Sequence, residues 1–294
     1  LVLKKTFDCN QGAVRSVRYN VDGSYCLTCG ADKKIKLWNP HKALLLKTYG
    51  GHADEITDAA GSCDSCHIVS SSLDKSVIYW DVTTGQPLRR LRSHAGGVNC
   101  VRFNEDSTVA ISGSRDNTVM CWDMRARTYE PIQTMKDAKD CITTVIITDH
   151  KIISSSLDGG IRHYDLRTCE CVADMMNRSI IHIAQTKDEQ CILAACTDSV
   201  LRLVDNDSGD ILSEYQGHKT EDFRIECGIL SNDSQVVSGT TEGKAVIWDL
   251  LQAKETAKLD IGEGVVNSLC THPTKTEIMF TNKRSIYLFG NNED

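Results

Sequence analysis

Short apolar segments alternate with polar turns along the whole chain, and their composition is that of β-strands. The runs ADKKIKLWN (31–39), LDKSVIYWD (73–81) and RDNTVMCWD (115–123) each follow a tight turn and are rich in β-branched and aromatic residues. The stretches 16–30 and 100–114 each contain two such runs around a polar turn, which predicts hairpins. Helical periodicity is absent throughout. The pattern therefore predicts an all-β protein.

The segments recur in one register. Trp38, Trp80 and Trp122 are 42 residues apart. The register continues, at steps of 42, 40, 44 and 40 residues, through Tyr164, Val204, Trp248 and Leu288. Six residues before these positions stand the turn residues Asp32, Asp74, Asp116, Asp158, Asp198, Glu242 and Asn282. Four strands in each of seven such units predict a seven-bladed β-propeller that forms a single domain over residues 1–294.

The N-terminal segment has a specific place in this architecture. Residues 2–8 (VLKKTFD) are similar to residues 45–51, the strand that precedes the second unit. The last unit, residues 265–289, supplies only three strands. We therefore expect the N-terminal strand to complete the last blade, which removes the open sheet edges.

Two short motifs identify the repeat. The dipeptides Gly51-His52 and Gly217-His218, with the Trp-Asp pairs at 80–81, 122–123 and 248–249, resemble the hallmarks of the WD-repeat family. The resemblance covers nearly the whole chain. In that family a His, a Ser or Thr, the turn acid and the Trp form a hydrogen-bonded set inside a blade. The resemblance implies three such structural sets: His52, Ser70, Asp74 and Trp80; His94, Ser112, Asp116 and Trp122; and His218, Ser238, Glu242 and Trp248.

Ser, His and Asp in one unit also suggest a hydrolase triad, but repetition argues against it. A triad is one constellation in one cleft, whereas these residues recur three times at the same register. A buried carboxylate needs hydrogen-bond partners, which explains the repeat structurally. The first unit has Asn10 where His is expected, and the fourth and fifth keep Asp158 and Asp198 without His or Trp. The seventh keeps almost nothing, so its blade is expected to be the weakest.

Composition narrows the function classes. Hydrophobic residues make up 40% and charged residues 25% of the chain, as in soluble globular proteins. No run reaches the eighteen or so apolar residues of a membrane span. The formal net charge of −7 and the lack of an aromatic stacking platform argue against direct, sequence-specific binding of nucleic acid.

The cysteines do not indicate a cofactor. Most of the 14 lie inside apolar strand segments, where Cys acts as a small buried hydrophobe in a reducing compartment. The segment 63–67 (CDSCH) matches a haem-attachment pattern, yet it fills the hairpin position that reads NVDGSY and NEDSTV in neighbouring units. Cys169 and Cys171 have no second ligand pair that would complete a zinc site. Phosphate-binding, dinucleotide-binding and metalloprotease motifs are absent, so we expect no enzyme, no metal and no cofactor.

Propellers carry their function on their faces. The narrower face exposes positions at the start of each inner strand and just before each turn acid. The register places thirteen candidate protein-binding residues there: Arg15, Glu55, Thr57, Leu73, Asn99, Arg115, Thr143, Leu157, His182, Arg224, Glu226, Thr241 and Asn267. Arg15, Arg115 and Arg224 are the best anchors, because Arg pairs with carboxylates through a fork. Leu73 and Leu157 suggest an apolar centre. The alternative is that some of these residues only line a wet channel.

Two resemblances concern partners. Units 110–125 and 152–167 end in Asp-x-Arg, with Arg125 and Arg167, and resemble the box by which some propellers dock onto cullin-ligase adaptors. That resemblance would make the chain a ubiquitin-ligase substrate receptor, although the motif also occurs in propellers without that role.

The closer resemblance is to small seven-bladed WD-repeat proteins that organise the mitogen-activated protein kinase cascade. It is carried by residues 27–40, 52–62, 94–114 and 201–219. It implies a non-enzymatic, monomeric scaffold of the extracellular-signal-regulated kinase cascade that is also found in catalytic-stage spliceosomes. The implied partners are spliceosomal subunits and kinase-cascade components, without a membrane, in nucleus and cytoplasm.

Overall fold

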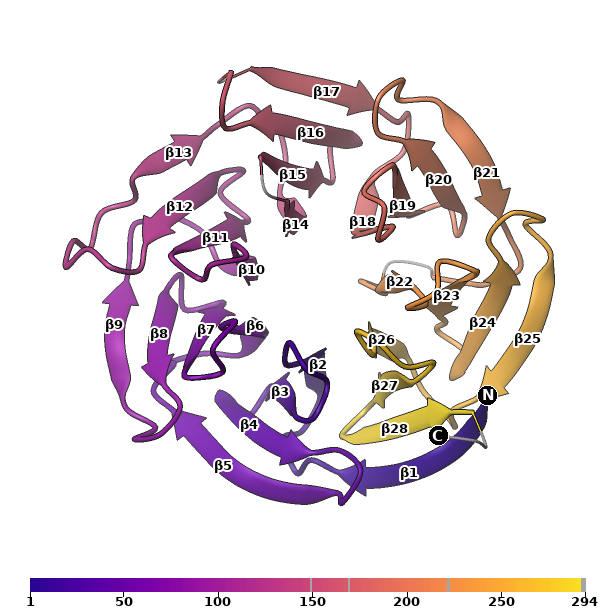
Figure 1. The fold of residues 1–294 in the computed structure, drawn as a ribbon, viewed down its shortest axis with the longest axis horizontal. Coiled ribbons are helices and arrows are strands. Elements are labelled where there is room, and N and C mark those ends of the chain that lie inside the picture. Colours follow the sequence, from indigo (N-terminus) through magenta and orange to yellow (C-terminus); the bar gives the residue numbers. More distant parts are fainter. Residues whose placement is uncertain (149, 169, 221–222, 292–294) are drawn as a thin grey trace.

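Seven four-stranded antiparallel sheets surround a central axis in the computed structural model (Figure 1). The structure describes residues 1–148, 150–168, 170–220 and 223–291. This described part contains 28 strands and no helix, and therefore no helix of the length and apolarity needed to cross a membrane. The predicted all-β, seven-bladed propeller is confirmed.

The first four blades follow one another in chain order. Blade 1 consists of β2 (Val14–Tyr19), β3 (Cys26–Gly30), β4 (Lys34–Asn39) and β5 (Leu44–Gly50). Blade 2 consists of β6 (Ile56–Gly61), β7 (His67–Ser72), β8 (Val77–Asp81) and β9 (Pro87–Leu91). Blade 3 consists of β10 (Val98–Phe103), β11 (Val109–Ser114), β12 (Val119–Asp123) and β13 (Gln133–Met135). Blade 4 consists of β14 (Ile142–Ile147), β15 (Lys151–Ser156), β16 (Gly160–Asp165) and β17 (Cys171–Met175).

The remaining blades complete the ring. Blade 5 consists of β18 (Ile180–Gln185), β19 (Cys191–Cys196), β20 (Leu201–Asp205) and β21 (Ile211–Tyr215). Blade 6 consists of β22 (Cys227–Ile229), β23 (Gln235–Gly239), β24 (Lys244–Asp249) and β25 (Glu255–Asp260). Blade 7 consists of β26 (Val266–Thr271), β27 (Ile278–Asn282), β28 (Ser285–Gly290) and β1 (Val2–Asp8).

The N-terminal strand closes the ring as expected. β1 pairs antiparallel with β28, with Phe7 opposite Ile286, and forms the outer strand of blade 7. Figure 1 shows the two strands side by side, indigo beside yellow. Phe7 is buried and its ring lies 5.1 Å from that of Trp38 in blade 1. The first strand therefore ties blade 7 to blade 1 through both hydrogen bonds and packing.

The hydrophobic core lies between the blades. Each of the seven buried clusters in the described residues is built from facing sides of two neighbouring blades. Val69 of blade 2, for example, packs in one cluster with Val101 and Trp122 of blade 3. The inner strands of each blade are covered by the neighbouring blades on both sides. Their residues are therefore buried along nearly the whole strand, as in β19, rather than alternating between inside and outside.

Six inner strands share a β-bulge near their first residue. The register shifts there leave Arg15, Thr57, Asn99, Thr143, Ile181 and Asn267 in the bulges. A bulge turns the extra residue away from the regular sheet, which directs these side chains toward one end of the central channel.

Blade 6 departs from this rule. Thr241 N donates to Lys219 O as Arg115 N donates to Gly97 O in blade 3. Cys227 pairs with Ser238 as Val101 pairs with Ser112. Between these fixed points blade 6 has the seven residues 220–226, and blade 3 has only 98–100. Blade 6 thus has four more residues than blade 3 between these two points, before its inner strand β22 begins.

The predicted register is wrong in blade 7. Phe280 pairs with Leu269, and Asn282 with Val266, as Ser112 pairs with Val101 and Ser114 with Val98. Phe280 and Phe289, rather than Ile278 and Leu288, therefore correspond to the Ser and Trp of the other units. The reason is a tighter hairpin, since Asn282 already pairs with Ser285 across a turn of two residues.

Candidate protein-binding face

Two of the three expected structural sets form complete networks. In blade 2, His52 Nδ1 lies 3.0 Å from Asp74 Oδ2, and His52 Nε2 lies 2.8 Å from Ser70 Oγ. Trp80 Nε1 donates to the same hydroxyl at 2.8 Å. In blade 3 the same network has distances of 2.9, 2.8 and 2.8 Å and is formed by His94, Asp116, Ser112 and Trp122.

These networks serve structure rather than catalysis. Ser70 and Ser112 are fully buried, so no substrate reaches either hydroxyl. Burial would raise the pKa of Asp74, but hydrogen bonds from His52, Ser76 and a backbone amide hold it well below its ordinary value. The carboxylate is therefore ionised and fixed as an acceptor.

The third expected set, in blade 6, does not form. Among the described residues, neither buried ring nitrogen of His218 has a hydrogen-bond partner, and Trp248 Nε1 donates to Gln216 O instead. Ser238 Oγ donates to the neighbouring carbonyl of Gly239. Glu242 is 51% exposed and pairs with Lys219 at 2.6 Å. Lys219 and Gly97 occupy equivalent positions, because each accepts a hydrogen bond from the residue before its turn acid. Lys219 comes one residue after His218, whereas Gly97 comes three residues after His94. This shorter connection places the lysine beside the turn acid.

Blade 1 has a variant of the network that the sequence did not reveal. Gln11, not Asn10, takes the place of His: its Nε2 donates to Asp32 at 3.2 Å and its Oε1 accepts from Thr28 Oγ1. Trp38 Nε1 donates to the same Thr28 hydroxyl at 3.0 Å. An amide replaces the imidazole because it also presents a donor and an acceptor.

Blades 4 and 5 satisfy the turn acid with an arginine. Arg162 lies 2.7 Å from Asp158, and Arg202 lies 2.7 Å from Asp198. Burial would raise the pKa of Asp158, but Arg162 and two backbone amides lower it to about 2. An Asp followed four positions later by Arg was the signal in the sequence.

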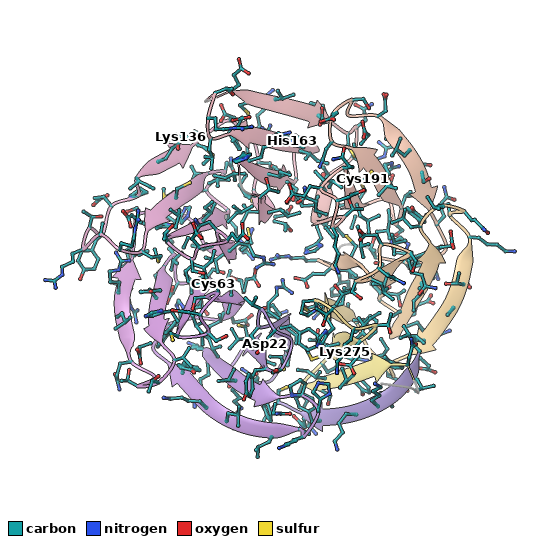
Figure 2. All side chains as sticks on the ribbon, viewed as in Figure 1. Asp22, Cys63, Lys136, His163, Cys191 and Lys275 are labelled. Carbon is teal, nitrogen blue, oxygen red and sulfur yellow. The ribbon has the colours of Figure 1, made fainter. Side chains whose placement is uncertain are left out.

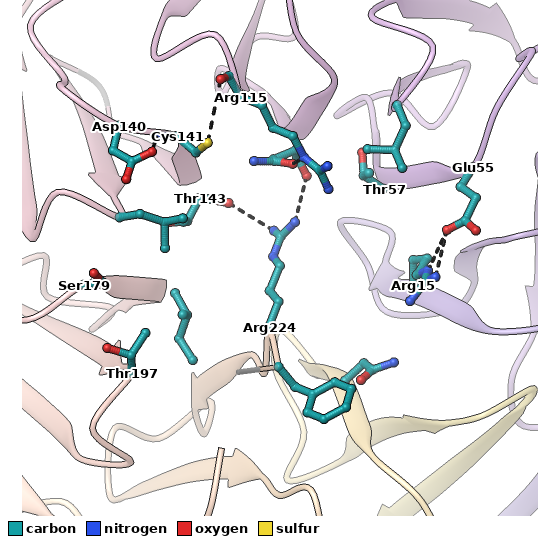
Figure 3. Close-up of a pocket in the computed structure, with 16 residues that line it drawn as sticks. Arg15, Glu55, Thr57, Arg115, Asp140, Cys141, Thr143, Ser179, Thr197 and Arg224 are labelled. Atoms are coloured by element: carbon teal, nitrogen blue, oxygen red, sulfur yellow. Dashed lines mark hydrogen bonds and ion pairs between the residues drawn. The ribbon is translucent and has the colours of Figure 1, made fainter. Parts of the chain in front are cut away.

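A cavity of about 700 Å³ opens at one end of the central channel (Figure 3). Ten of the thirteen predicted face residues line it: Arg15, Glu55, Thr57, Leu73, Asn99, Arg115, Thr143, Leu157, Arg224 and Asn267. The prediction did not include six further lining residues: Asp140, Cys141, Ser179, Ile181, Thr197 and Phe223. We call this set of sixteen residues the central face.

Arg224 spans the opening of the central face. It lies just before β22 in blade 6, and its Nη1 and Nη2 donate to Asn99 O in blade 3 and to Thr143 O in blade 4, both at 3.1 Å. Figure 3 shows the side chain extending across the opening. Arg15, in contrast, forms an ion pair with Glu55 at 2.9 Å between blades 1 and 2.

Three predicted face residues lie elsewhere. His182 and Glu226 are buried below the opening, because both follow the bulge and the backbone turns their side chains inward. Burial lowers the pKa of His182 to about 3. Thr241 is half-buried, does not line the cavity, and hydrogen-bonds to Lys219 O.

Glu226 belongs to a buried ion network around the channel. Arg18 lies 2.6 Å from Glu226 and 3.0 Å from Asp58, which also contacts Arg102. Ser268 Oγ donates to Glu226 at 2.6 Å. Burial alone would raise the pKa of Glu226, but Arg18 holds it well below its ordinary value. These contacts join the inner strands of blades 1, 2, 3 and 7 to blade 6.

The remaining motifs occupy the turns. Cys63 and Cys66 are exposed between β6 and β7, and Figure 2 shows Cys63 on the inner part of blade 2. Cys171 is exposed at the start of β17, and Cys169 lies outside the described residues. Over the described ranges no three His, Cys, Asp or Glu side chains could hold a metal ion together. Arg125 and Arg167 are 73% and 66% exposed, each near the Asp two residues before it.

A seven-bladed ring with a buried His–Ser–Asp–Trp network defines the class of WD-repeat propellers. Residues 1–39, 44–81 and 85–123 match the family described as WD domain, G-beta repeat. The chain belongs to the WD-repeat family and, within it, to the group of WD repeat domain-containing protein 83. Propellers of this class are generally non-enzymatic scaffolds for protein interactions.

The relatives match over nearly their whole length. The chain is 57% identical to WD repeat domain-containing protein 83 of Rattus norvegicus over 92% of this chain and 85% of the relative. It is 54% identical to the protein of that name in Homo sapiens over 92% of this chain and 86% of the relative. The WD repeat domain-containing protein 83 homolog of Dictyostelium discoideum is 32% identical over 94% of this chain and 93% of the relative.

Proposed function

We propose that the chain is a non-enzymatic scaffold that binds partner proteins on the central face. The observation that carries the proposal is the cavity of about 700 Å³, in which ten residues from the thirteen-residue prediction meet. It combines three arginines with the exposed Phe223 and the half-buried Leu73 and Leu157, a composition typical of protein-binding hot spots. Neither complete His–Ser–Asp network is accessible to a substrate.

The finer proposal concerns the partners. We infer that the chain acts in the catalytic-stage spliceosome during pre-mRNA splicing and as an organizer of the extracellular-signal-regulated kinase cascade, in nucleus and cytoplasm. The resemblance of residues 27–40, 52–62, 94–114 and 201–219 to the mitogen-activated protein kinase organizer supports this assignment. The net charge of −7 favours contacts with spliceosomal proteins over contacts with RNA.

The experiment is affinity purification of the tagged chain from nuclear and cytosolic extracts, followed by mass spectrometry. An Arg15→Glu, Arg115→Glu variant runs beside the wild type, because both side chains line the opening and neither is buried. We expect spliceosomal proteins in the nuclear sample, kinase-cascade proteins in the cytosolic sample, and loss of both sets from the variant.

The matched control is Arg125→Glu, Arg167→Glu, which reverses two exposed charges outside the central face. Both variants should melt at the wild-type temperature. If partners survive the first double reversal, the central face is not the binding surface. If only the control loses its partners, and these include a cullin adaptor, the ligase-receptor alternative replaces the scaffold.

A further inference from the structure

Two arginines of the central face converge on one neutral residue. Arg115 is exposed in the turn after β11, and its Nε donates to Asn99 Oδ1 at 3.1 Å. Arg224 reaches the same residue from blade 6, with Nη1 on Asn99 O at 3.1 Å. Figure 3 shows the two labelled side chains directed toward one another over the opening. Two like charges are therefore held close together.

Neither cation forms an ion pair with a carboxylate of the described residues. Over residues 1–148, 150–168, 170–220 and 223–291, no ion pair involves Arg115 or Arg224, and Arg224 Nε is buried without an acceptor. The other arginines near the axis differ, because Arg15 pairs with Glu55, and Arg18 with Asp58 and Glu226. A guanidinium bonded only to neutral acceptors gains strongly when a carboxylate arrives, since charge-assisted hydrogen bonds are about twice as strong.

Apolar side chains surround this pair. Leu73, Leu157, Ile181 and Phe223 line the same cavity, and Phe223 is 48% exposed. A ligand that places an anionic group between the two arginines would also place its neighbouring groups against these apolar side chains. This favours a ligand that carries apolar groups beside its anionic group. A linear protein segment has this chemistry when an acidic residue is flanked by apolar ones.

We propose that Arg115 and Arg224 bind the carboxylate of an Asp or Glu side chain in a partner segment, with flanking apolar side chains against Phe223 and the two leucines. The inference rests on the proposed function and names its ligand class. Among the described residues, three arginines and two carboxylates line the cavity, and this balance suits a singly charged carboxylate. A phosphate group carries nearly two negative charges, which is less favourable in a cavity whose lining already includes Glu55 and Asp140. A basic side chain would be repelled by the positive charge of Arg224 in the opening.

The test uses synthetic peptide pools with one fixed central residue between randomised apolar positions. The fixed residue is Asp, Glu, Gln, Lys or phosphoserine, and affinity is measured by fluorescence polarisation on the purified full chain. The Asp and Glu pools should bind roughly 10- to 100-fold tighter than the Gln pool, as expected for a charge-assisted pair. The Lys pool should be the weakest.

Variants locate the effect. Arg224→Met and, independently, Arg115→Met should each reduce the preference for Glu over Gln, while Arg125→Met, an arginine outside the cavity, should keep it. Arg224→Lys retains the charge but loses the fork, so the preference should fall only in part. Melting temperatures identify any variant that is unfolded, and the other variant then decides.

Three results would overturn the inference: equal binding of the Glu and Gln pools, tighter binding of the phosphoserine pool, or a preference unchanged in both methionine variants. Absence of peptide binding, with partner proteins still captured through Arg15 and Arg115, would also overturn it. In all four cases the proposed scaffold function stands, because the capture experiment tests that function separately.

Discussion

At the scale of residues, the position of one carboxylate separates complete networks from incomplete ones. Asp74 and Asp116 accept both from an imidazole and from the next backbone amide, that of Ala53 or Ala95. In blade 6 the corresponding acid, Glu242, faces solvent beside a lysine. The same sequence motif therefore forms a buried network in blades 2 and 3 and a surface ion pair in blade 6.

This difference gives a paired prediction. Asp116→Ala should lower the free energy of unfolding by about 1–3 kcal/mol, because buried donors lose their acceptor. Glu242→Ala, at the equivalent position, should change it by no more than about 0.5 kcal/mol, since it removes an exposed ion pair. Urea unfolding of both variants measures the effect. Equal losses would show that Glu242 does support His218.

A second prediction concerns pH. Burial lowers the pKa of His218 to about 4, from an ordinary value near 6.5. Between these values the unfolded chain binds a proton that the folded chain does not, so stability falls as the pH drops from about 6.5 to about 4. His182, whose pKa burial lowers to about 3, acts in the same direction.

The variant His218→Leu isolates this contribution. Among the described residues neither ring nitrogen has a hydrogen-bond partner. The free energy of unfolding of the variant at pH 7 should therefore lie within about 1 kcal/mol of the wild-type value. Between pH 6.5 and 4.5 it should lose distinctly less stability than the wild type. Denaturant unfolding at several pH values measures how the free energy of unfolding depends on pH in the variant and in the wild type. The same dependence in both proteins would contradict the lowered pKa of His218.

At the scale of elements, blades 1, 4 and 5, which lack the histidine, each carry a cation on the third strand. Lys36, Arg162 and Arg202 stand opposite Thr28, Ser154 and Ala194, where blades 2 and 3 have Ile78 and Met120. Each cation lies four positions after the turn acid and within 4.0 Å of it. Blades 1, 4 and 5 are thus stabilised in another way, and we do not expect them to be weak points.

A transplant in blade 4 tests this equivalence. Arg162→Met leaves Asp158 half enclosed without its cation and should cost about 3 kcal/mol of unfolding free energy. Adding Ala138→His should recover part of the loss. Lys139 N bonds Asp158 as Ala95 N bonds Asp116, so position 138 corresponds to His94, and the buried Ser154 Oγ lacks a partner. No recovery in thermal unfolding would mean that the two networks are not interchangeable.

The strands were largely predictable from the sequence, and the positions of the loops were not. Seven units and the closing role of residues 2–8 follow from the spacing of aromatic and turn residues, which reflects packing between blades. The additional residues before β22, among them Arg224, had one indication in the sequence, the step of 44 residues from Val204 to Trp248. Whether additional residues fall in a hairpin or before an inner strand depends on hydrogen bonds that no local pattern encodes.

At the scale of the whole molecule, the predicted face residues line the opening where the bulges repeat and are buried just beyond them. Thr57, Asn99 and Thr143 occupy the same bulge position and line the opening. His182 and Glu226 lie one residue further along, and this single step moves a side chain from the opening into the buried ion network. Alternation along a strand therefore sets which residues a partner meets and which ones hold the blades together.

The pairing of β1 with β28 orders events during synthesis. The first strand leaves the ribosome roughly 15–60 s before the strand it needs, at translation rates of about 5–20 residues per second. During that interval its edge has no native partner. Lys4 and Lys5 in its middle discourage pairing with other nascent strands, as charged residues do on exposed sheet edges. The ring is therefore completed only after the last blade has been translated. Until then, the charges on the first strand, and any chaperone that shields it, protect the nascent chain from aggregation.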